Sequence, residues 1–469
     1  MQEKAESSGA GETEISQKEL DRRILKIIWP VTLDSILMLS IGLVTSALVG
    51  RLPEAALAIS AVGLSQRITQ ISWALFGGLA TGTTVLVARA IGAKDDKGAR
   101  YTAVNAISLT LILVLLLTAL AFPLAEPILR LLNAEGELLR VTLDYLSIAL
   151  FALPFLATMQ IIAGVARGMG DTRTPMIISF FVNLLNALAG WTLIYGRFGF
   201  AAMGVTGAAV AIVFSQAIGA ILALIYISSK IGIGLRLRDF LEATGTETMR
   251  ILRVGLPASA EMLFWQMATM VMMGLLVTFG EVSVSAHQLG LQAEGISYMP
   301  GVGFGIAATT LLGHSFGAKN PGLAKRYFRR IVSWGVAVSF FTSLIMFFFN
   351  IQLMSAFTNS WEIIELGAFY LWLMSFTQIP YIFNSTIAGA LRSSGDVRSP
   401  MYIAGAGMWG IRIPLSFIMG ASISIGNLSF GLNLGVKGVW YAMTIDIFIR
   451  LILSIWRYTT IRWDKVKEI

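Results

Sequence analysis

Long apolar stretches separated by short polar connections run through almost the whole chain. A helix of about 20 apolar residues is long enough to cross a hydrocarbon core of about 30 Å. The pattern therefore predicts an all-α integral membrane protein with about twelve transmembrane helices. The predicted spans are 24–49, 57–88, 103–123, 141–163, 175–195, 203–227, 251–278, 284–312, 331–351, 363–390, 400–420 and 436–456.

Basic residues are distributed unequally between the two sets of connections that this span count defines. One set contains Arg89, Lys94, Lys97, Arg100, Arg167, Arg173, Lys230, Arg236, Arg238, Lys319, Lys325, Arg326, Arg329, Arg330, Arg392 and Arg398. The opposite set contains only Arg51, Arg130, Arg140, Arg197 and Lys437. Because Lys and Arg are retained on the cytoplasmic side, the bias predicts a multi-pass protein of the cell membrane with both termini in the cytoplasm.

Short motifs recur between the two halves of the chain. The sequence Gly-Ala-Lys at 92–94 returns at 317–319, and Gly-Asp-x-Arg-x-Pro-Met at 170–176 returns at 395–401, both with an offset of 225. Gly-Val-x-Gly at 204–207 returns at 435–438, with an offset of 231. The repeat predicts two pseudo-symmetric six-helix bundles around a central cavity, residues 20–235 and 236–469, after a flexible polar tail at 1–19.

The amino-acid composition and net charge of the chain exclude several functional classes. The chain is 56% hydrophobic and 13% charged, which is typical of membrane proteins, and it contains no cysteine for a disulfide or a thiolate metal site. Its net charge of +8 is explained by basic loops beside anionic lipid, so we expect membrane lipids and no nucleic acid as partners. The polar first 18 residues do not resemble a signal peptide, so the first span is expected to direct insertion.

Two carboxylates lie inside predicted spans at equivalent positions of the repeat. Asp34 follows Pro30 by four residues in the first span, and Glu261 follows Pro257 by four in the seventh. A buried acid at this depth can bind a proton or a sodium ion and release it when water reaches it. We therefore expect Asp34 and Glu261 to be ion-coupling residues, with no other metal or cofactor.

An alternative interpretation is that each acid is only neutralised by an internal basic side chain, such as Arg67 for Asp34. Asp446 and Arg412, in the last two spans, are interpreted as a structural ion pair of this kind.

Polar, aromatic and thioether side chains within the spans are candidates for the lining of a substrate cavity, although packing and interhelical hydrogen bonds explain such residues equally well. The candidates are Thr45, Gln160, Asn186, Trp265, Gln266, Met267, Glu294, Tyr298, Tyr381 and Asn384.

Signatures of enzymes are absent from the sequence. It contains neither a GxxxxGK[ST] phosphate loop nor an HExxH motif, and it has only two histidines. A transporter without a nucleotide site must draw its energy from an ion gradient or from the gradient of its substrate. We therefore expect no enzyme activity.

The repeat, the prolines at 30 and 257 and the paired Gly-Asp loops together resemble the MATE (multidrug and toxic compound extrusion) family, within the multidrug/oligosaccharidyl-lipid/polysaccharide flippase superfamily. The resemblance covers about residues 20–460. It implies an antiporter that expels bulky, often cationic organic compounds against an inward flow of protons or sodium ions.

The resemblance also implies roles for individual positions. Glu261 lies where many members have a seventh-span acid used in ion coupling. Members with a first-span aspartate usually place it where this chain has Thr45, and the fifth-span Asn-x-x-x-Asp pattern is reduced to Asn186 with Gly190. Tyr381 occupies a tenth-span position that is acidic in some sodium-coupled members. Asp34 is therefore a candidate substitute for the missing acids.

The sequence favours a monomeric secondary-active antiporter that exports amphiphilic organic cations, in exchange for protons or sodium ions, by alternating access. A flippase for a lipid-linked precursor is the alternative, and its cavity would be rich in Arg and Lys facing phosphates. The few basic residues within the spans favour the export of cations.

Overall fold

The computed structural model describes residues 16–230, 245–421, 423–425, 428–460 and 463. Within this part of the chain, eleven helices are long and apolar enough to cross a membrane, or twelve if one bent pair forms a single span. This confirms the predicted helical membrane fold. The predicted boundary between the halves at 235/236 and most of the predicted tail lie outside the described residues, and the first helix begins at Gln17 rather than after residue 19.

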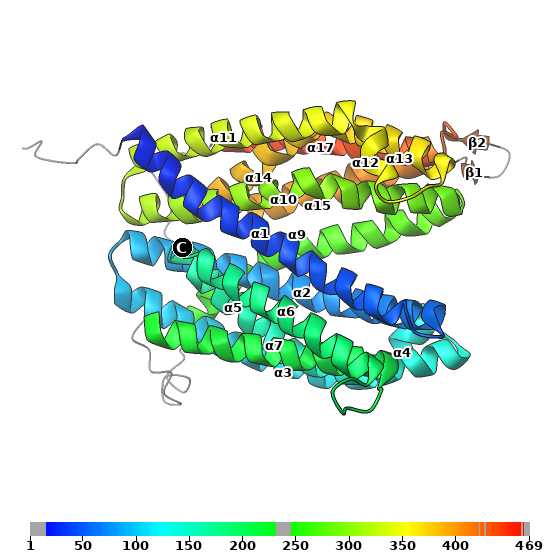
Figure 1. Cartoon of the computed structure of the whole chain (residues 1–469). Coiled ribbons are helices and arrows are strands. Elements are labelled where there is room, and N and C mark those ends of the chain that lie inside the picture. Colours follow the sequence, from blue (N-terminus) through cyan, green and yellow to red (C-terminus); the bar gives the residue numbers. More distant parts are fainter. Residues whose placement is uncertain (1–15, 231–244, 422, 426–427, 461–462, 464–469) are drawn as a thin grey trace, which may run out of the picture.

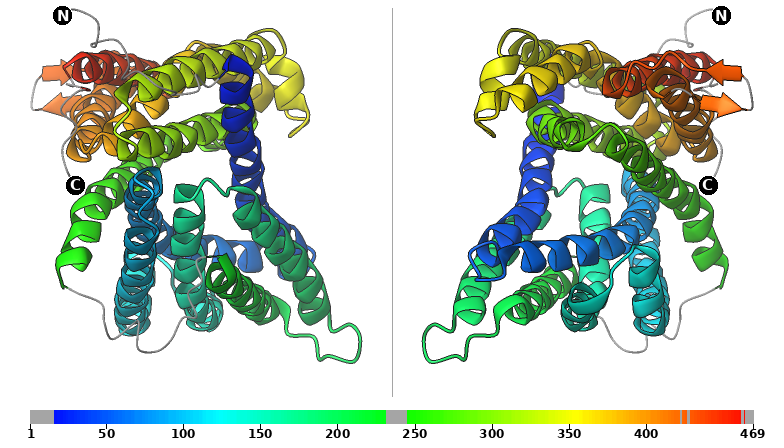
Figure 2. Two further views of the ribbon diagram at one scale, coloured as in Figure 1. Left: turned by 90° about the vertical axis from the view of Figure 1, so that its left-hand side faces the viewer. Right: turned by 90° about the vertical axis from the view of Figure 1, so that its right-hand side faces the viewer.

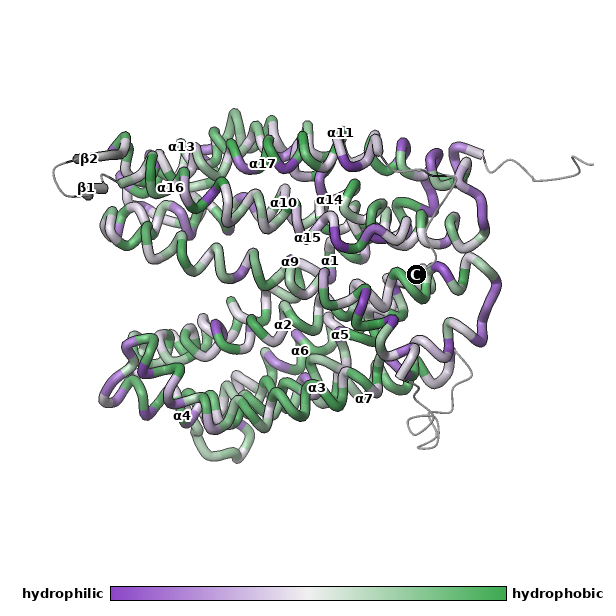
Figure 3. Tube along the Cα trace, turned by 180° about the vertical axis from the view of Figure 1, so that it is seen from behind, coloured by the Kyte–Doolittle hydropathy of each residue, from purple (hydrophilic) through white to green (hydrophobic). Residues whose placement is uncertain are grey.

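The helices form two layers, one from each half of the chain (Figure 1). The first layer contains α1 Gln17–Val49, α2 Ala55–Gly92, α3 Asp96–Leu131, α4 Gly136–Ala149, the 3-10 turn η1 Leu150–Ala152, α5 Leu153–Gly168, α6 Arg173–Tyr195 and α7 Gly204–Lys230. Hydrophobic residues dominate both layers, while hydrophilic residues gather in the connections at the two ends (Figure 3).

The second layer repeats this arrangement with more interruptions. It contains α9 Gly245–Val277, α10 Glu281–Gly317, α11 Pro321–Phe348, α12 Asn350–Ser355, α13 Trp361–Ser375, α14 Gln378–Ser393, α15 Arg398–Gly405, the π-helix η2 Ala406–Arg412, α16 Ile413–Gly420 and α17 Val436–Thr459. A two-stranded antiparallel hairpin, β1 Ile423–Ile425 and β2 Leu428–Phe430, joins α16 to α17.

The fourth and tenth predicted spans are interrupted at equivalent places of the repeat. The turn η1 separates α4 from α5, and α13 meets α14 at an angle of 51°. Pro154 and Pro380 follow these breaks, and neither can donate a hydrogen bond to the carbonyl four residues earlier. The same effect occurs within α1, where the carbonyl of Lys26, freed by Pro30, accepts a hydrogen bond from the Thr172 hydroxyl at 3.3 Å.

The first helix of each half begins against the opposite half. Leu20, Ile24 and Ile28 of α1 belong to a hydrophobic cluster with Phe304 of α10, and Figure 2 shows α1 running from one layer to the other. The start of α1 is also held by Asp21, which accepts two hydrogen bonds from the Arg330 guanidinium at 2.5 and 2.7 Å.

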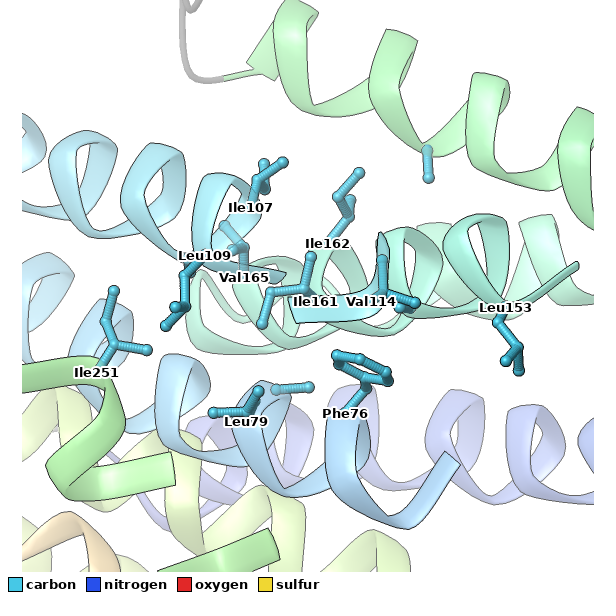
Figure 4. Close-up of a cluster of buried hydrophobic side chains, with 14 of the residues drawn as sticks. Phe76, Leu79, Ile107, Leu109, Val114, Leu153, Ile161, Ile162, Val165 and Ile251 are labelled. Carbon is cyan, nitrogen blue, oxygen red and sulfur yellow. The ribbon is translucent and has the colours of Figure 1, made fainter. Parts of the chain in front are cut away.

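Helix α9 makes the corresponding crossing in the other direction. Its residues Ile251 and Val254 complete the core of the first half, where Ile251 lies near Leu79 and Leu109 (Figure 4). The predicted division into 20–235 and 236–469 therefore does not describe the packing of these two helix starts.

The two halves meet closely at the end of the molecule that contains the Gly-Ala-Lys turns. A Cβ atom at Gly92 would overlap the carbonyl of His314, and one at Gly317 would overlap the carbonyl of Arg89. Glycine at both positions permits this approach of α2 and α10. Two hydrogen bonds reinforce it at repeat-related positions: Arg89 Nε donates to the Ser393 carbonyl at 2.9 Å, and His314 Nε2 lies 2.8 Å from the Gly168 carbonyl.

Candidate ion and substrate site

Asp34 is buried in the first half and engaged by two side chains. It lies on α1, four residues after Pro30, and its side chain is 7% exposed. The Arg167 guanidinium, at the end of α5, donates to Oδ2 at 3.1 Å, and the Ser179 hydroxyl of α6 donates to Oδ1 at 2.6 Å. The basic partner is thus Arg167 and not Arg67, which is exposed on α2.

Glu261 forms the equivalent pair in the second half. The Arg392 guanidinium, in the last turn of α14, donates through Nη2 to both carboxylate oxygens, at 2.9 and 2.7 Å. Arg392 follows Arg167 by 225 residues, the offset of the sequence repeat. Each half therefore holds one acid on its first helix and one arginine just before its Gly-Asp loop. In the sequence these arginines belong to the basic connections and precede the repeated Gly-Asp loops, and their common offset indicates a shared role.

The hydrogen-bond partners of Asp34 include few oxygen atoms that could bind a hard cation. Hard cations are bound by several oxygen ligands. The described partners of Asp34 supply one hydroxyl and one guanidinium, and the guanidinium would repel a sodium ion. Among the described residues, no group of three or more His, Asp or Glu side chains could hold a metal ion.

Asp446 lies at the centre of a second buried charge cluster. The Arg412 guanidinium donates to it at 2.8 Å, and the Arg450 guanidinium donates to its two oxygens at 2.9 and 2.8 Å. Gly407, in the π-helix η2, allows this packing because a Cβ there would overlap both Asp446 and Arg450. Asp446 is completely buried, and the two guanidiniums that hydrogen-bond to it more than compensate its single negative charge.

Glu294 contacts neither Glu261 nor the arginine cluster through a hydrogen bond in the described structure. Its carboxylate accepts from the Tyr370 hydroxyl at 2.5 Å and from the Gln378 amide at 3.0 Å. These two partners could not be predicted from the sequence, because they lie on α13 and α14 and meet Glu294 of α10 only in the folded protein.

The remaining cavity candidates lie in separate places. Asn186 donates to Thr45 at 3.4 Å, the rings of Tyr298 and Tyr381 contact each other at a tilt with centroids 4.7 Å apart, and the Ser454 hydroxyl donates to Asn384 at 2.5 Å. On α9, Trp265 and Met267 are exposed, and Gln266 donates to Gln70 of the other half at 3.3 Å. The structure does not gather the ten candidates into one pocket within its described residues.

A small cavity adjoins the Asp34 pair inside the first half. Its volume is about 20 Å³, which is large enough to hold a water molecule. The polar side chains that line it belong to Asp34, Gln160, Arg167, Ser179 and Tyr226. Of the sequence candidates for a substrate cavity, only Gln160 belongs to its described lining. A volume this small cannot hold a drug-sized molecule.

Comparison with known proteins places these features in a family. The MatE family model matches residues 30–192 and 257–418, two segments that begin at Pro30 and Pro257. The chain is 30% identical over 450 residues to "Probable multidrug resistance protein NorM" of Thermotoga maritima, covering 95% of this chain and 94% of that protein. It is 24% identical over 441 residues to "Uncharacterized transporter YisQ" of Bacillus subtilis, covering 94% of each.

Solved structures share the whole fold. One described as "Outward-facing conformation of a multidrug resistance MATE family transporter of the MOP superfamily" superposes with a TM-score of 0.84 at 22% sequence identity. The superposition covers 96% of this chain and 97% of that one.

Proposed function

Because this chain belongs to the MATE family of multidrug efflux transporters, we propose that it is a secondary-active antiporter which exports amphiphilic organic cations in exchange for protons. Members of this family are transporters rather than enzymes. The observation that carries the proposal is the pair of repeat-related acids, Asp34 and Glu261, each bound to an arginine of its own half.

The acid of each pair can be ionised or protonated, so each pair has two states, and the binding of a proton favours the second. With the acid ionised, its charge is neutralised by the arginine, which ties the first helix of a half to the end of α5 or α14. Protonation removes the charge of the acid and weakens this tie. Helices α1 and α9 each begin against the opposite half. Protonation of Asp34 or Glu261 therefore changes the packing between the halves.

The same contacts support the orientation that we propose. The closely packed end with Gly92 and Gly317 carries the basic connections, so we assign it to the cytoplasm together with both termini. In this assignment the described conformation is closed toward the cytoplasm. One chain supplies both halves of the path, so the expected functional unit is a monomer in the cell membrane.

The flippase alternative is less favoured by the contacts of the basic side chains. Arg167, Arg392 and Arg412, which lie within or at the ends of spans, are each paired with an acid. Phosphate groups would have to displace those acids. Arg67 is exposed on α2, so a variant of it can discriminate between the two functions.

The test is the uptake of a fluorescent cationic dye into inside-out vesicles, with proton and sodium gradients imposed separately. We expect a proton gradient alone to drive uptake in the wild type. Asp34→Asn and Glu261→Gln remove the proton-binding groups, and at least one should reduce uptake by about tenfold or more, the effect of losing about 1.4 kcal/mol of barrier lowering.

Glu126→Gln is the control for that measurement, because Glu126 pairs with Arg130 on an exposed surface. It should leave uptake unchanged. Uptake driven by sodium alone would contradict the proton assignment, and unchanged uptake after neutralising both acids would contradict their role in coupling.

A further inference from the structure

The cavity beside Asp34 contains a buried polar group without a partner. Gln160 is 4% exposed, and its amide nitrogen Nε2 has no hydrogen-bond partner among the described residues. Leaving a buried donor unpaired is unfavourable, so such a group is usually satisfied by an ordered water. The cavity has room for one water, and several polar side chains line it.

Tyr226 connects this cavity to the end of the molecule that carries the Gly-Asp loops. Tyr226 lines the cavity together with Asp34, and its hydroxyl donates to Asp171 Oδ2 at 2.8 Å. Asp171 lies in the connection between α5 and α6, and its side chain is partly exposed. The phenol thus lies between a buried carboxylate and a carboxylate that solvent can reach.

The surroundings of Asp171 favour its ionised form, so this carboxylate releases a proton readily. Partial burial raises its pKa, but hydrogen bonds from the backbone and hydroxyl of Thr174, the Tyr226 hydroxyl and the backbone of Arg173 outweigh this. The net effect lowers the pKa of Asp171 below its ordinary value. The group is therefore ionised at neutral pH, and a proton that reaches it is released quickly to water.

The second half has no such connection at the equivalent position. The last helices of the two halves are related by an offset of 231, which places Arg457 where the first half has Tyr226. Arg457 Nε donates to Asp396, the counterpart of Asp171, at 2.6 Å. A guanidinium has no acceptor atom and is not deprotonated in proteins, so it cannot relay a proton.

We propose that Asp34, a cavity water, Tyr226 and Asp171 form a proton relay that joins the buried acid of the first half to the cytoplasm. Protonated Asp34 donates its proton to the water while the water donates one of its own to the Tyr226 oxygen. Tyr226 in turn donates its hydroxyl proton to Asp171, which releases it to bulk water. One proton crosses, and the water and the phenol are regenerated. This inference rests on the proposed proton-coupled antiport.

The test compares two kinds of transport by the full-length protein in proteoliposomes. The first is dye uptake driven by a proton gradient, and the second is the exchange of labelled for unlabelled dye at equal pH, which moves no net protons. Tyr226→Phe should slow the driven uptake by about tenfold or more, because a positioned proton-transfer group contributes typically about 100-fold or more. Exchange and dye affinity should stay within about twofold of wild type.

Two further variants complete the design. Tyr195→Phe makes the same substitution at a partly buried hydrogen bond of the same half, to the Leu48 carbonyl at 2.6 Å, and should leave both kinds of transport unchanged. Asp171→Asn retains an acceptor for Tyr226 but cannot take up the proton, so it should reproduce the selective loss.

The outcomes separate the relay from the function on which it rests. If Tyr226→Phe leaves driven uptake unchanged, or reduces driven uptake and exchange equally, the relay is wrong while proton antiport stands. If the wild type shows dye exchange but no proton-driven uptake, the proposed proton antiport is itself wrong and the relay falls with it.

Discussion

Asp34 and Glu261 occupy equivalent positions, yet their surroundings differ. The Asp34 side chain is 7% exposed and accepts hydrogen bonds from Arg167 and Ser179, whereas Glu261 is 24% exposed and is bound by Arg392 alone among the described residues. Removing Arg167 would therefore leave a more deeply buried carboxylate than removing Arg392. The first half is also the one in which a cavity and Tyr226 adjoin the acid.

A double-mutant cycle separates the structural role of Asp34 from its role in coupling. Asp34→Asn alone leaves Arg167 buried without its counter-charge and should destabilise the protein by about 3–5 kcal/mol. Adding Arg167→Gln removes the unpaired charge, so thermal stability in detergent should largely recover while proton-driven transport remains lost. A double variant that transports at the wild-type rate would show that Asp34 serves only to neutralise Arg167.

Arg67 tests the charge of the substrate. It is exposed on α2, three residues before Gln70, which contacts Gln266 across the interface between the halves. A positive charge on this face repels a cation, so Arg67→Gln should lower the half-saturating dye concentration, by up to about tenfold for a loss of about 1.4 kcal/mol of repulsion. Arg67→Lys, which keeps the charge, is the control.

A loss of transport in Arg67→Gln would indicate an anionic substrate. If Arg67→Gln weakens or abolishes transport and Arg67→Lys retains it, the positive charge attracts the substrate. An anionic substrate, such as the phosphate of a lipid-linked precursor, would then replace organic cations in the proposal.

Helix interruptions are the features that sequence reasoning located only in part. The fourth and tenth spans were predicted as single helices, although Pro154 and Pro380 lie within them. A proline marks a position where the backbone lacks an N–H hydrogen-bond donor. The direction of the resulting bend depends on side chains from other helices, such as the Ser343 hydroxyl that donates to the Ser375 carbonyl, and those contacts exist only in the folded protein.

The close crossing of α2 and α10 gives a prediction for alternating access. Gly317→Val would force side-chain atoms into the carbonyl of Arg89 and oppose closure of this end. Overpacking costs about 1–3 kcal/mol, which shifts a two-state ratio by about 5- to 150-fold. Maleimide labelling of Ala88→Cys, a fully buried position in the described state, should therefore speed up, and transport should fall.

Gly274→Val in α9 is the matched control, because a Cβ there meets no atom within 4 Å. The chain contains no native cysteine, so the introduced one is the only thiol that can be labelled. Unchanged labelling and transport in Gly317→Val would show that this crossing does not have to open during the cycle.

At the scale of the whole molecule, the internal repeat predicted the two layers and the equivalence of Asp34 with Glu261. It did not predict that the starts of α1 and α9 pack against the opposite half. Residues such as Ile24 and Ile251 are apolar, which predicts that they are buried. An apolar pattern does not show which helix covers the buried face. The common offset of Arg167 and Arg392 indicates that they are equivalent, but their acidic partners and the hydrogen bond of Tyr226 are seen only in the fold, because contacts between distant helices leave no local pattern in a sequence.

The central claim is that proton movement and cation export are obligatorily coupled. Its most direct test uses proteoliposomes that contain a pH-sensitive dye, with equal pH on both sides and an organic cation gradient as the only driving force. The account predicts that cation flux drives protons in the opposite direction and builds a pH difference, which Asp34→Asn abolishes. Cation flux through the wild-type protein with no change in internal pH would contradict it.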